Sequence, residues 1–179
     1  SQDQYRLYHL RVSHDGKLLS SVPISLPNEV FSPMGAFSPN GGILSYTDAK
    51  LAGLREPYFS FLACSDTDGN LRFTKSLKAK NINLSVTQAV LQNDGSATIY
   101  GTAERSSKKL FRVFKLELDA SGQILSRDVR DFATRADYQY TVKLDPLSNA
   151  YVVTEDENRI AIVPFEDLPV LDDIEFMLE

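Results

Sequence analysis

The chain has 179 residues, of which 42% are hydrophobic and 24% are charged, as in an ordinary globular domain. This composition excludes a collagen-like chain, a long coiled coil and a chain that is disordered throughout. The formal net charge of −5 argues against a dedicated nucleic-acid binder, which usually carries a basic domain. No long apolar, uncharged window is present, so we expect no transmembrane helix.

Two series of turn signals repeat along the chain with one common period. Within each series the equivalent positions lie 53 residues apart. Asp-Gly and Asn-Gly allow the positive φ that tight hairpin turns require. The first series is Asp15-Gly16, Asp68-Gly69 and Ser121-Gly122, and the second is Asn40-Gly41-Gly42, Asn93-Asp94-Gly95 and Pro146-Leu147-Ser148-Asn149.

The residues between the turns follow a period of two. Phe114, Leu116 and Leu118 occupy alternate positions, which is typical of one face of a β-strand. The flanking apolar positions also recur every 53 residues, so each unit is expected to hold two hairpins. Three units then give twelve short strands, with almost no helix. Examples of equivalent positions are Tyr8, Phe61 and Phe114, and Leu10, Ala63 and Leu116.

Four antiparallel strands in each repeat of this length are typical of a propeller blade. The sequence therefore predicts an all-β, β-propeller-like domain over residues 4–163. Its three four-stranded blades are expected at 4–57, 58–110 and 111–163, and an acidic and apolar tail follows at 164–179.

One stretch, residues 90–126, resembles bacterial β-propeller repeats. The matching residues are Asp94-Gly95, Gly101, Lys115-Leu116, Asp119 and Gly122, and Phe37-Ser38-Pro39 before Asn40-Gly41 is similar to a turn of WD40-like propeller proteins. The resemblance implies the fold rather than one function, and it slightly favours an exported protein, although the compartment is left open. The sequence departs from true WD40 repeats because it has no Gly-His or Trp-Asp pair.

Three blades are fewer than the four to eight of closed propellers, and an open arc would leave free strand edges. Three solutions stay open. Two copies of the chain could form a six-bladed ring, the chain could be a piece of a longer propeller, or a different propeller-like chain could complete it. Arg159–Val163 is a candidate for a closing strand across the junction.

Few residues carry a signal for chemistry. Asp66 and Asp68 are a weak calcium candidate, since alternate carboxylates suit a hard cation, but a plain hairpin turn accounts for them equally. His9 and His14 lie in no recognisable catalytic or metal motif. Cys64 aligns with Arg11 and Glu117 and is expected to be half exposed. We therefore expect no cofactor, no resident metal and no catalysis.

Two segments are candidates for association with a protein. A basic cluster lies at the junction of the second and third units, where an acidic partner would bind, for example the tail of another copy. In the tail, apolar residues alternate with acidic ones, as in a peptide that docks in a groove or adds to a sheet edge. The residues are Arg105, Lys108, Lys109 and Arg112 in the cluster, and Leu171, Ile174 and Phe176 in the tail.

The function that these patterns favour is a non-catalytic scaffold for protein–protein interaction or assembly, completed by a partner or a second copy. A lectin-like or small-ligand-binding propeller is the alternative. A fragment of a propeller hydrolase or lyase is a third reading, which would need catalytic residues from other blades because both histidines fall in the first unit.

Overall fold

The computed structural model describes residues 7–26, 30–38, 41–48, 60–105, 110–132, 139–155 and 159–179. These residues form antiparallel β-sheets and no α-helix, with a 3₁₀ turn, η2 (Phe165–Asp167), near the C-terminus. The prediction of an all-β chain is confirmed, and none of the described sheets closes on itself.

The strands fall into a two-stranded sheet, two five-stranded sheets and a three-stranded sheet. Each is described by its strands in the order in which they pair. The first is β1 (Leu7–Val12) and β2 (Leu18–Ile24). The second is β3 (Val30–Ser38), β4 (Gly41–Asp48), β5 (Ser60–Ser65), β6 (Leu71–Ala79) and β15 (Phe176–Leu178). The third is β7 (Asn83–Leu91), β8 (Ala97–Arg105), β9 (Leu110–Leu118), β10 (Ile124–Asp131) and β14 (Val170–Leu171), and the fourth is β11 (Gln139–Leu144), β12 (Ala150–Glu155) and β13 (Ile160–Pro164).

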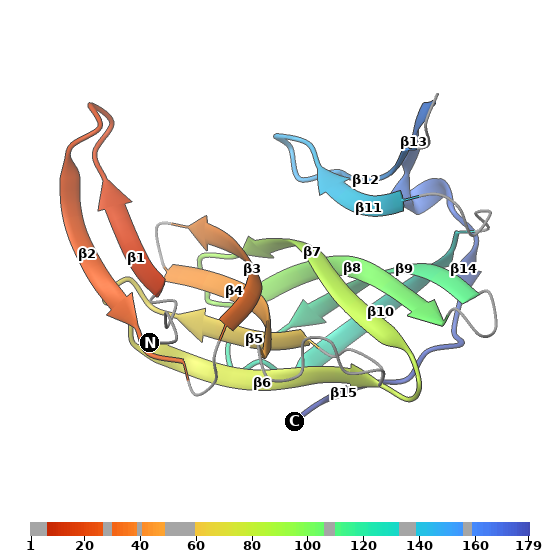
Figure 1. Cartoon of the computed structure of the whole chain (residues 1–179), viewed down its shortest axis with the longest axis horizontal. Helices are drawn as coiled ribbons and strands as arrows, with labels where there is room; N and C mark the ends of the chain where they lie inside the picture. The colour runs from red at the N-terminus through yellow and green to blue at the C-terminus, as the bar shows by residue number, and fades with distance from the viewer. Residues whose placement is uncertain are drawn as a thin grey trace, which may run out of the picture.

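The four sheets follow one another along an arc. Figure 1 shows the β1–β2 hairpin at one end, the two five-stranded sheets in the middle, and β11–β13 at the other end. In each five-stranded sheet, four strands that are consecutive in the sequence pair as neighbours, and the fifth comes from the end of the chain. We refer to β1–β2 and β11–β13 as the end sheets.

Several strands begin at positions that differ by the sequence period. Strands β2, β6 and β10 begin at Leu18, Leu71 and Ile124, and each start is 53 residues after the last. The same spacing separates the starts of β1 and β5, and those of β3 and β7. Strands in equivalent positions of the period therefore occupy equivalent positions in successive sheets.

The grouping of hairpins into sheets differs from the blade boundaries that the sequence predicted. The four consecutive strands of each middle sheet span Val30–Ala79 and Asn83–Asp131. A unit such as 4–57 therefore contributes its first hairpin to one sheet and its second hairpin to the next. The period gives the spacing of equivalent strands along the sequence. It does not determine whether a hairpin joins the hairpin before it or the hairpin after it in a sheet.

An aspartate side chain within the turn holds several of the hairpins, as Asp94 and Asp119 do. The Asp119 carboxylate Oδ1 accepts hydrogen bonds from the backbone N–H groups of Ser121, at 2.9 Å, and Gln123, at 2.8 Å. These bonds keep the pKa of Asp119 below its usual value. Gly122 has φ of +77° in this turn, which favours glycine. The sequence located these turns correctly because their chemistry is local.

The main core lies between the two middle sheets. The predicted alternation is confirmed, since Phe114, Leu116 and Leu118 are buried against residues of β4, β5 and β6. Val113, on the opposite face of β9, is also fully buried, because that face packs against β11 and β12. Cys64 is likewise fully buried rather than half exposed, since its side of β5 faces this core.

Candidate functional site

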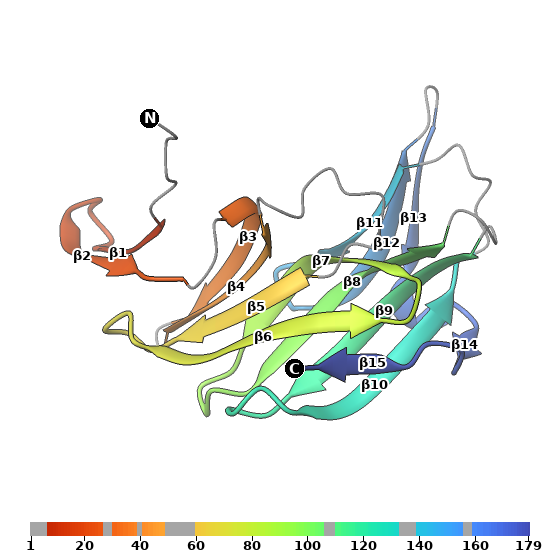
Figure 2. The same ribbon diagram turned by 60° about the horizontal axis from the view of Figure 1, so that its bottom comes forward.

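The C-terminal segment 165–179, called here the strap, runs back across both middle sheets. Strand β14 adds to the outer edge of β10, and β15 adds to the outer edge of β6. Figure 2 shows β14 and β15 along these edges. Ser76 and Glu179 exchange two backbone hydrogen bonds of 2.8 and 3.1 Å at the end of the chain.

The apolar residues of the strap pack on the chain's own sheets. Ile174 is 2% exposed and Phe176 is 9% exposed, and the Phe176 ring lies 5.0 Å from that of Phe114. Leu171 is half-buried opposite Val129. The sequence was right that this tail suits a sheet edge. It did not identify the edge, and in this structure the three residues are not exposed to a partner.

In the predicted basic cluster, Arg112 is paired with acidic residues of its own chain. Nη1 of Arg112 lies 2.7 Å from Asp131 Oδ1, and its Nη2 lies 2.9 Å from Asp173 Oδ2 in the strap. Arg105 ends β8 and is half-buried. The other two members, Lys108 and Lys109, lie outside the described residues. The expected attraction between Arg112 and an acidic tail is therefore present, but within one chain.

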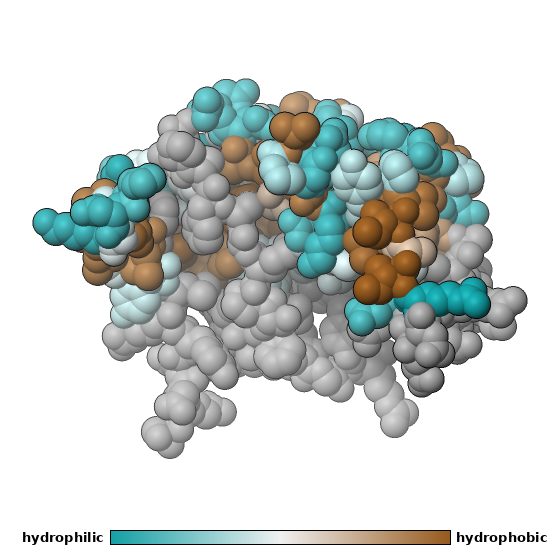
Figure 3. Space-filling model, turned by 90° about the horizontal axis from the view of Figure 1, so that it is seen from above, coloured by the Kyte–Doolittle hydropathy of each residue, from teal (hydrophilic) through white to brown (hydrophobic). Residues whose placement is uncertain are grey.

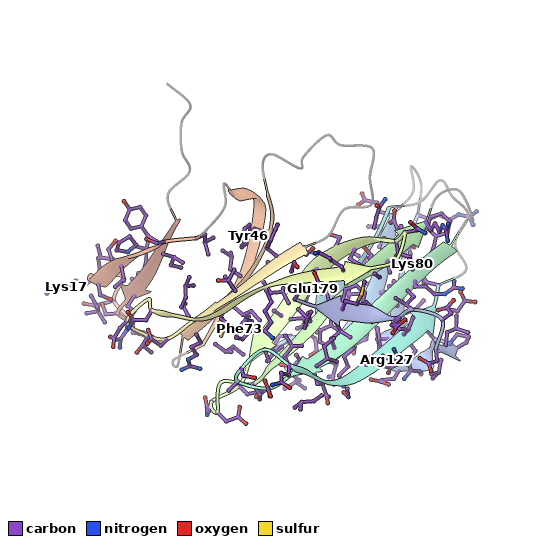
Figure 4. The ribbon with its side chains drawn as sticks, turned by 90° about the horizontal axis from the view of Figure 1, so that it is seen from below. Lys17, Tyr46, Phe73, Lys80, Arg127 and Glu179 are labelled. Atoms are coloured by element: carbon purple, nitrogen blue, oxygen red, sulfur yellow. The ribbon has the colours of Figure 1, made fainter. Side chains whose placement is uncertain are left out.

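A second arginine anchors the start of the strap. Arg130 is 9% exposed and lies over the Phe165 ring, with 5.5 Å to the ring centroid. It donates to both carboxylate oxygens of Asp128, which raises the pKa of its guanidinium. It also donates to Glu166 and to the backbone oxygen of Leu168. Figure 4 shows Arg127, Lys80 and Glu179 among the side chains around the strap.

Two of the features singled out for chemistry, the Asp66 turn and Cys64, are held in a hairpin turn and in the core. The two carboxylate oxygens of Asp66 accept three hydrogen bonds from Asp68 and Asn70 within their own turn. The calcium candidate Asp66 and Asp68 is thus accounted for by turn geometry. Burial raises the pKa of the Cys64 thiol, which disfavours the nucleophilic thiolate. Within the described ranges no three His, Cys, Asp or Glu residues are grouped as metal ligands.

His14 and Tyr140 also carry titratable side chains. His14 is exposed beside the first turn, and the side chain of His9 lies outside what the structure describes. Burial and the nearby Glu104 carboxylate raise the pKa of Tyr140 far above its usual value. That shift keeps the phenol protonated, so Tyr140 is unsuited to act as a base near neutral pH.

The end sheets carry the exposed apolar residues that sequence reasoning missed. In Figure 3 brown side chains gather at the left end, over β1–β2, and at the right end, over the last sheet. In β1 these are positions whose equivalents elsewhere in the chain are largely buried, as the pairs Tyr8 and Phe114 or Leu10 and Leu116 show. The exposed fractions are 46% for Tyr8, 55% for Leu10 and Val12, 69% for Ile160 and 64% for Ile162.

One signal in the sequence pointed to these strands. The segment Arg159–Val163 was predicted to supply a closing strand, and β13 (Ile160–Pro164) is indeed a strand. It pairs with β12 of the same chain. Its other edge pairs with no strand of the described residues. An edge cannot be recognised from the sequence when the strand count of the sheet is unknown.

A small apolar pocket lies between the first end sheet and the neighbouring middle sheet. Its volume is about 40 Å³, and Tyr8, Ile24, Leu44 and Leu71 are among the side chains that line it. This volume has room for a few water molecules. It is far below the 300–1,000 Å³ of typical ligand pockets, as an order of magnitude.

Neither a scan against models of known protein families nor a search of curated proteins found a match for this chain. In the part of the chain that the structure describes, none of the elements is a helix that could span a membrane.

Proposed function

We propose that this chain belongs to a β-propeller-type ring and acts as a non-catalytic scaffold that binds protein through its end sheets. The contacts between sheets support the propeller arrangement. Strand β7 contacts β3 on one side and β11 on the other. Each of these is the first strand of its sheet in chain order, as the innermost strands of neighbouring propeller blades are.

The packing of the sheets supports the same arrangement. One core cluster joins the two middle sheets face to face, and a second joins β7–β10 to β11–β12. The sheet that contains β7–β10 is thus covered on both sides, as a blade within a ring is. The 53-residue spacing of equivalent strands fits a repeat of one blade per period.

The single observation that carries the scaffold function is the exposure of apolar residues on the end sheets. Leu10 and Ile162 are each more than half exposed, on strands with an edge that pairs with no described strand. Contiguous exposed apolar surface and free edges favour association with protein. A small-ligand-binding propeller is the alternative, although the pocket beside β1, at about 40 Å³, is too small for a typical ligand.

Capture from an extract of the source cells tests this function, with variants that separate the end sheets from other exposed apolar positions. We expect Leu10→Lys and Ile162→Lys to lose bound protein that the unchanged chain retains. Leu125→Lys is the matched control, since Leu125 is 66% exposed on a middle sheet. Equal capture by all three variants, or no specific capture by the unchanged chain, would contradict the proposal.

A further inference from the structure

Strand β1 lacks a neighbour that both of its equivalents have. Strand β5 lies between β4 and β6, and β9 lies between β8 and β10. Strand β1 pairs with β2, the equivalent of β6 and β10, and with no other strand of the described residues. The missing neighbour is therefore the equivalent of β4 and β8, each of which is the second strand of an antiparallel hairpin.

The backbone of β1 has hydrogen-bonding groups available along this edge. Tyr8 lies opposite Pro23 in β2, and Leu10 lies two positions further along, opposite Ser21. Proline has no N–H group, and bonded and non-bonded pairs alternate in an antiparallel ladder. Tyr8 and Leu10 are therefore in the pairs that do not bond to β2, so their N–H and C=O groups point to the free edge. An added antiparallel strand would bond to these groups.

The outer surface of the β1–β2 hairpin lacks contacts that its equivalents make. A Cβ atom at Gly69 would lie 2.5 Å from Val22 in β2. A Cβ atom at Gly122 would lie 2.9 Å from Phe73 in β6. At the equivalent position, Gly16, nothing else of the described chain lies within 4 Å. The turn of each middle sheet thus meets the sheet before it, whereas the turn of β1–β2 is open and leaves room for a partner.

A second copy of this chain does not offer the missing strand among its described residues. Strands β4, β8 and β12 are the second strands of their hairpins, and each already has a partner on both edges. The free edge of β13 belongs to a strand that is equivalent to β1 itself. In a ring of equivalent sheets, β13 and β1 run in the same direction, whereas the neighbour of β1 is antiparallel. The topology therefore favours a different protein as the source of the strand.

Strand β9 is the closer match to β1 among its two equivalents. Tyr8 aligns with the aromatic Phe114 in β9. Leu10 aligns with Leu116 in β9, but with the small Ala63 in β5. Strand β8, which occupies the equivalent edge of β9, is therefore the better guide to the missing neighbour.

The pairing of β8 with β9 shows which side chains such a neighbour carries. Ile99 lies opposite Leu116, and both are fully buried. Gly101 lies opposite Phe114, and a Cβ atom at Gly101 would come within 2.5 Å of the Phe114 ring. A large apolar residue beside the leucine and a small residue beside the aromatic ring therefore let the two strands pack on one face.

We propose that the free edge of β1 binds a β-hairpin of a different protein, whose second strand adds antiparallel to β1. The bound strand carries a large apolar residue opposite Leu10 and a small residue opposite Tyr8, as β8 does toward β9. This inference rests on the scaffold function proposed above and names the chemistry of its partner. Recognition at a sheet edge combines main-chain hydrogen bonds, which give affinity, with side-chain fit, which gives specificity.

A synthetic hairpin with the sequence of residues 83–105 is the probe, because its second strand, β8, occupies the equivalent edge of β9. Asn83→Cys and Glu104→Cys, at positions that pair in the third sheet, close it with a disulfide, since an isolated hairpin is marginally stable. Fluorescence anisotropy of the labelled hairpin should show saturable binding to the unchanged full chain. Leu10→Lys in the chain should weaken binding by about tenfold or more, and Leu125→Lys should leave it unchanged. Unchanged circular dichroism spectra would show that both chain variants still fold.

Two variants of the hairpin test the side-chain fit. Gly101→Val places a branched side chain opposite Tyr8 and should weaken binding by about tenfold or more. Thr102→Val is the matched control, because it places the same side chain one position along, on the other face of the strand. It should bind as the unchanged hairpin does. Equal binding by the two hairpin variants would overturn the proposed pairing.

The remaining outcomes separate this inference from the scaffold function. No binding of the closed hairpin, or binding that Leu10→Lys does not weaken, overturns the inference. Loss of captured protein by Ile162→Lys but not by Leu125→Lys would then still support the scaffold. A chain that is a dimer by light scattering, and a monomer as Leu10→Lys, also overturns the inference, since a second copy then occupies the edge. Leu10-dependent hairpin binding without variant-dependent capture supports the edge site and contradicts the scaffold function.

Discussion

The two middle sheets and the two end sheets are built from the same kinds of strand but differ in what covers them. In the middle, Leu116 is fully buried, and the strap pairs with the ends of the outer edges of β6 and β10. At the ends, the equivalent residue Leu10 is 55% exposed, and β1 and β13 each have a free edge in the described chain. Position within the stack, rather than strand composition, therefore decides which residues stabilise the chain and which are available for association.

The largest expected effect comes from removing the strap's aromatic anchor. Phe176→Ala should lower the free energy of unfolding by about 3–5 kcal/mol, since it leaves a cavity beside Phe114. Met177→Ala, one residue further along the same strand at 41% exposure, should change it by about 0.5 kcal/mol or less. Urea unfolding measures both values. Equal losses would mean that the strap does not stabilise the middle sheets.

A close contact within the third sheet should give the next largest effect. A Cβ atom at Gly101 would lie 2.5 Å from the Phe114 ring and 2.3 Å from the backbone oxygen of Ser85. Gly101→Ala should therefore destabilise the fold by about 1–3 kcal/mol or more.

The double variant Gly101→Ala with Phe114→Leu provides the control. If ring contact is the cause, the two losses should be less than additive in a double-mutant cycle. Strict additivity would assign the loss to the backbone alone.

The ion pairs of Arg112 separate a structural role from a binding role. Arg112→Ala removes charged hydrogen bonds to Asp131 and Asp173, and we expect a loss of about 1–2 kcal/mol. Limited proteolysis of the strap should accelerate, because Asp173 would lose its partner. Asp173→Asn should show the same direction with a smaller loss. If Arg112→Ala changed neither the stability nor the rate of cleavage, Arg112 would again be a candidate for binding a partner at the surface.

The turn carboxylates predict a smaller, pH-dependent effect. Hydrogen bonds lower the pKa of Asp66, Asp119 and Asp145 below 3.8 in the folded chain. A lowered folded pKa contributes stability at pH values above about 4, and this contribution is lost as the pH falls through the folded pKa. Thermal unfolding between pH 6 and pH 2.5 should show the loss. Asp119→Asn should flatten that dependence slightly, and an identical profile would contradict the linkage.

Much of the fold was predictable because its signals are local. The turns depend on residues within five positions of one another, as the bonds of Asp119 to Ser121 and Gln123 show. The site was less predictable. Ile162 is exposed and Ile174 is buried, although both lie in short segments that contain apolar and polar residues. Only the packing of the sheets in the folded chain distinguishes the two positions.

The sequence by itself determined the antiparallel strands, their turns and the 53-residue spacing, since alternation and turn chemistry act over a few residues. The tertiary structure decided which hairpins share a sheet, that Arg112 holds the chain's own tail, and that Cys64 is buried. These outcomes depend on contacts between residues far apart in the chain. A strand edge can form hydrogen bonds with many different strands, and an apolar face can pack against many others. Which partner each one meets depends on the packing of the sheets and is not encoded by a local sequence pattern.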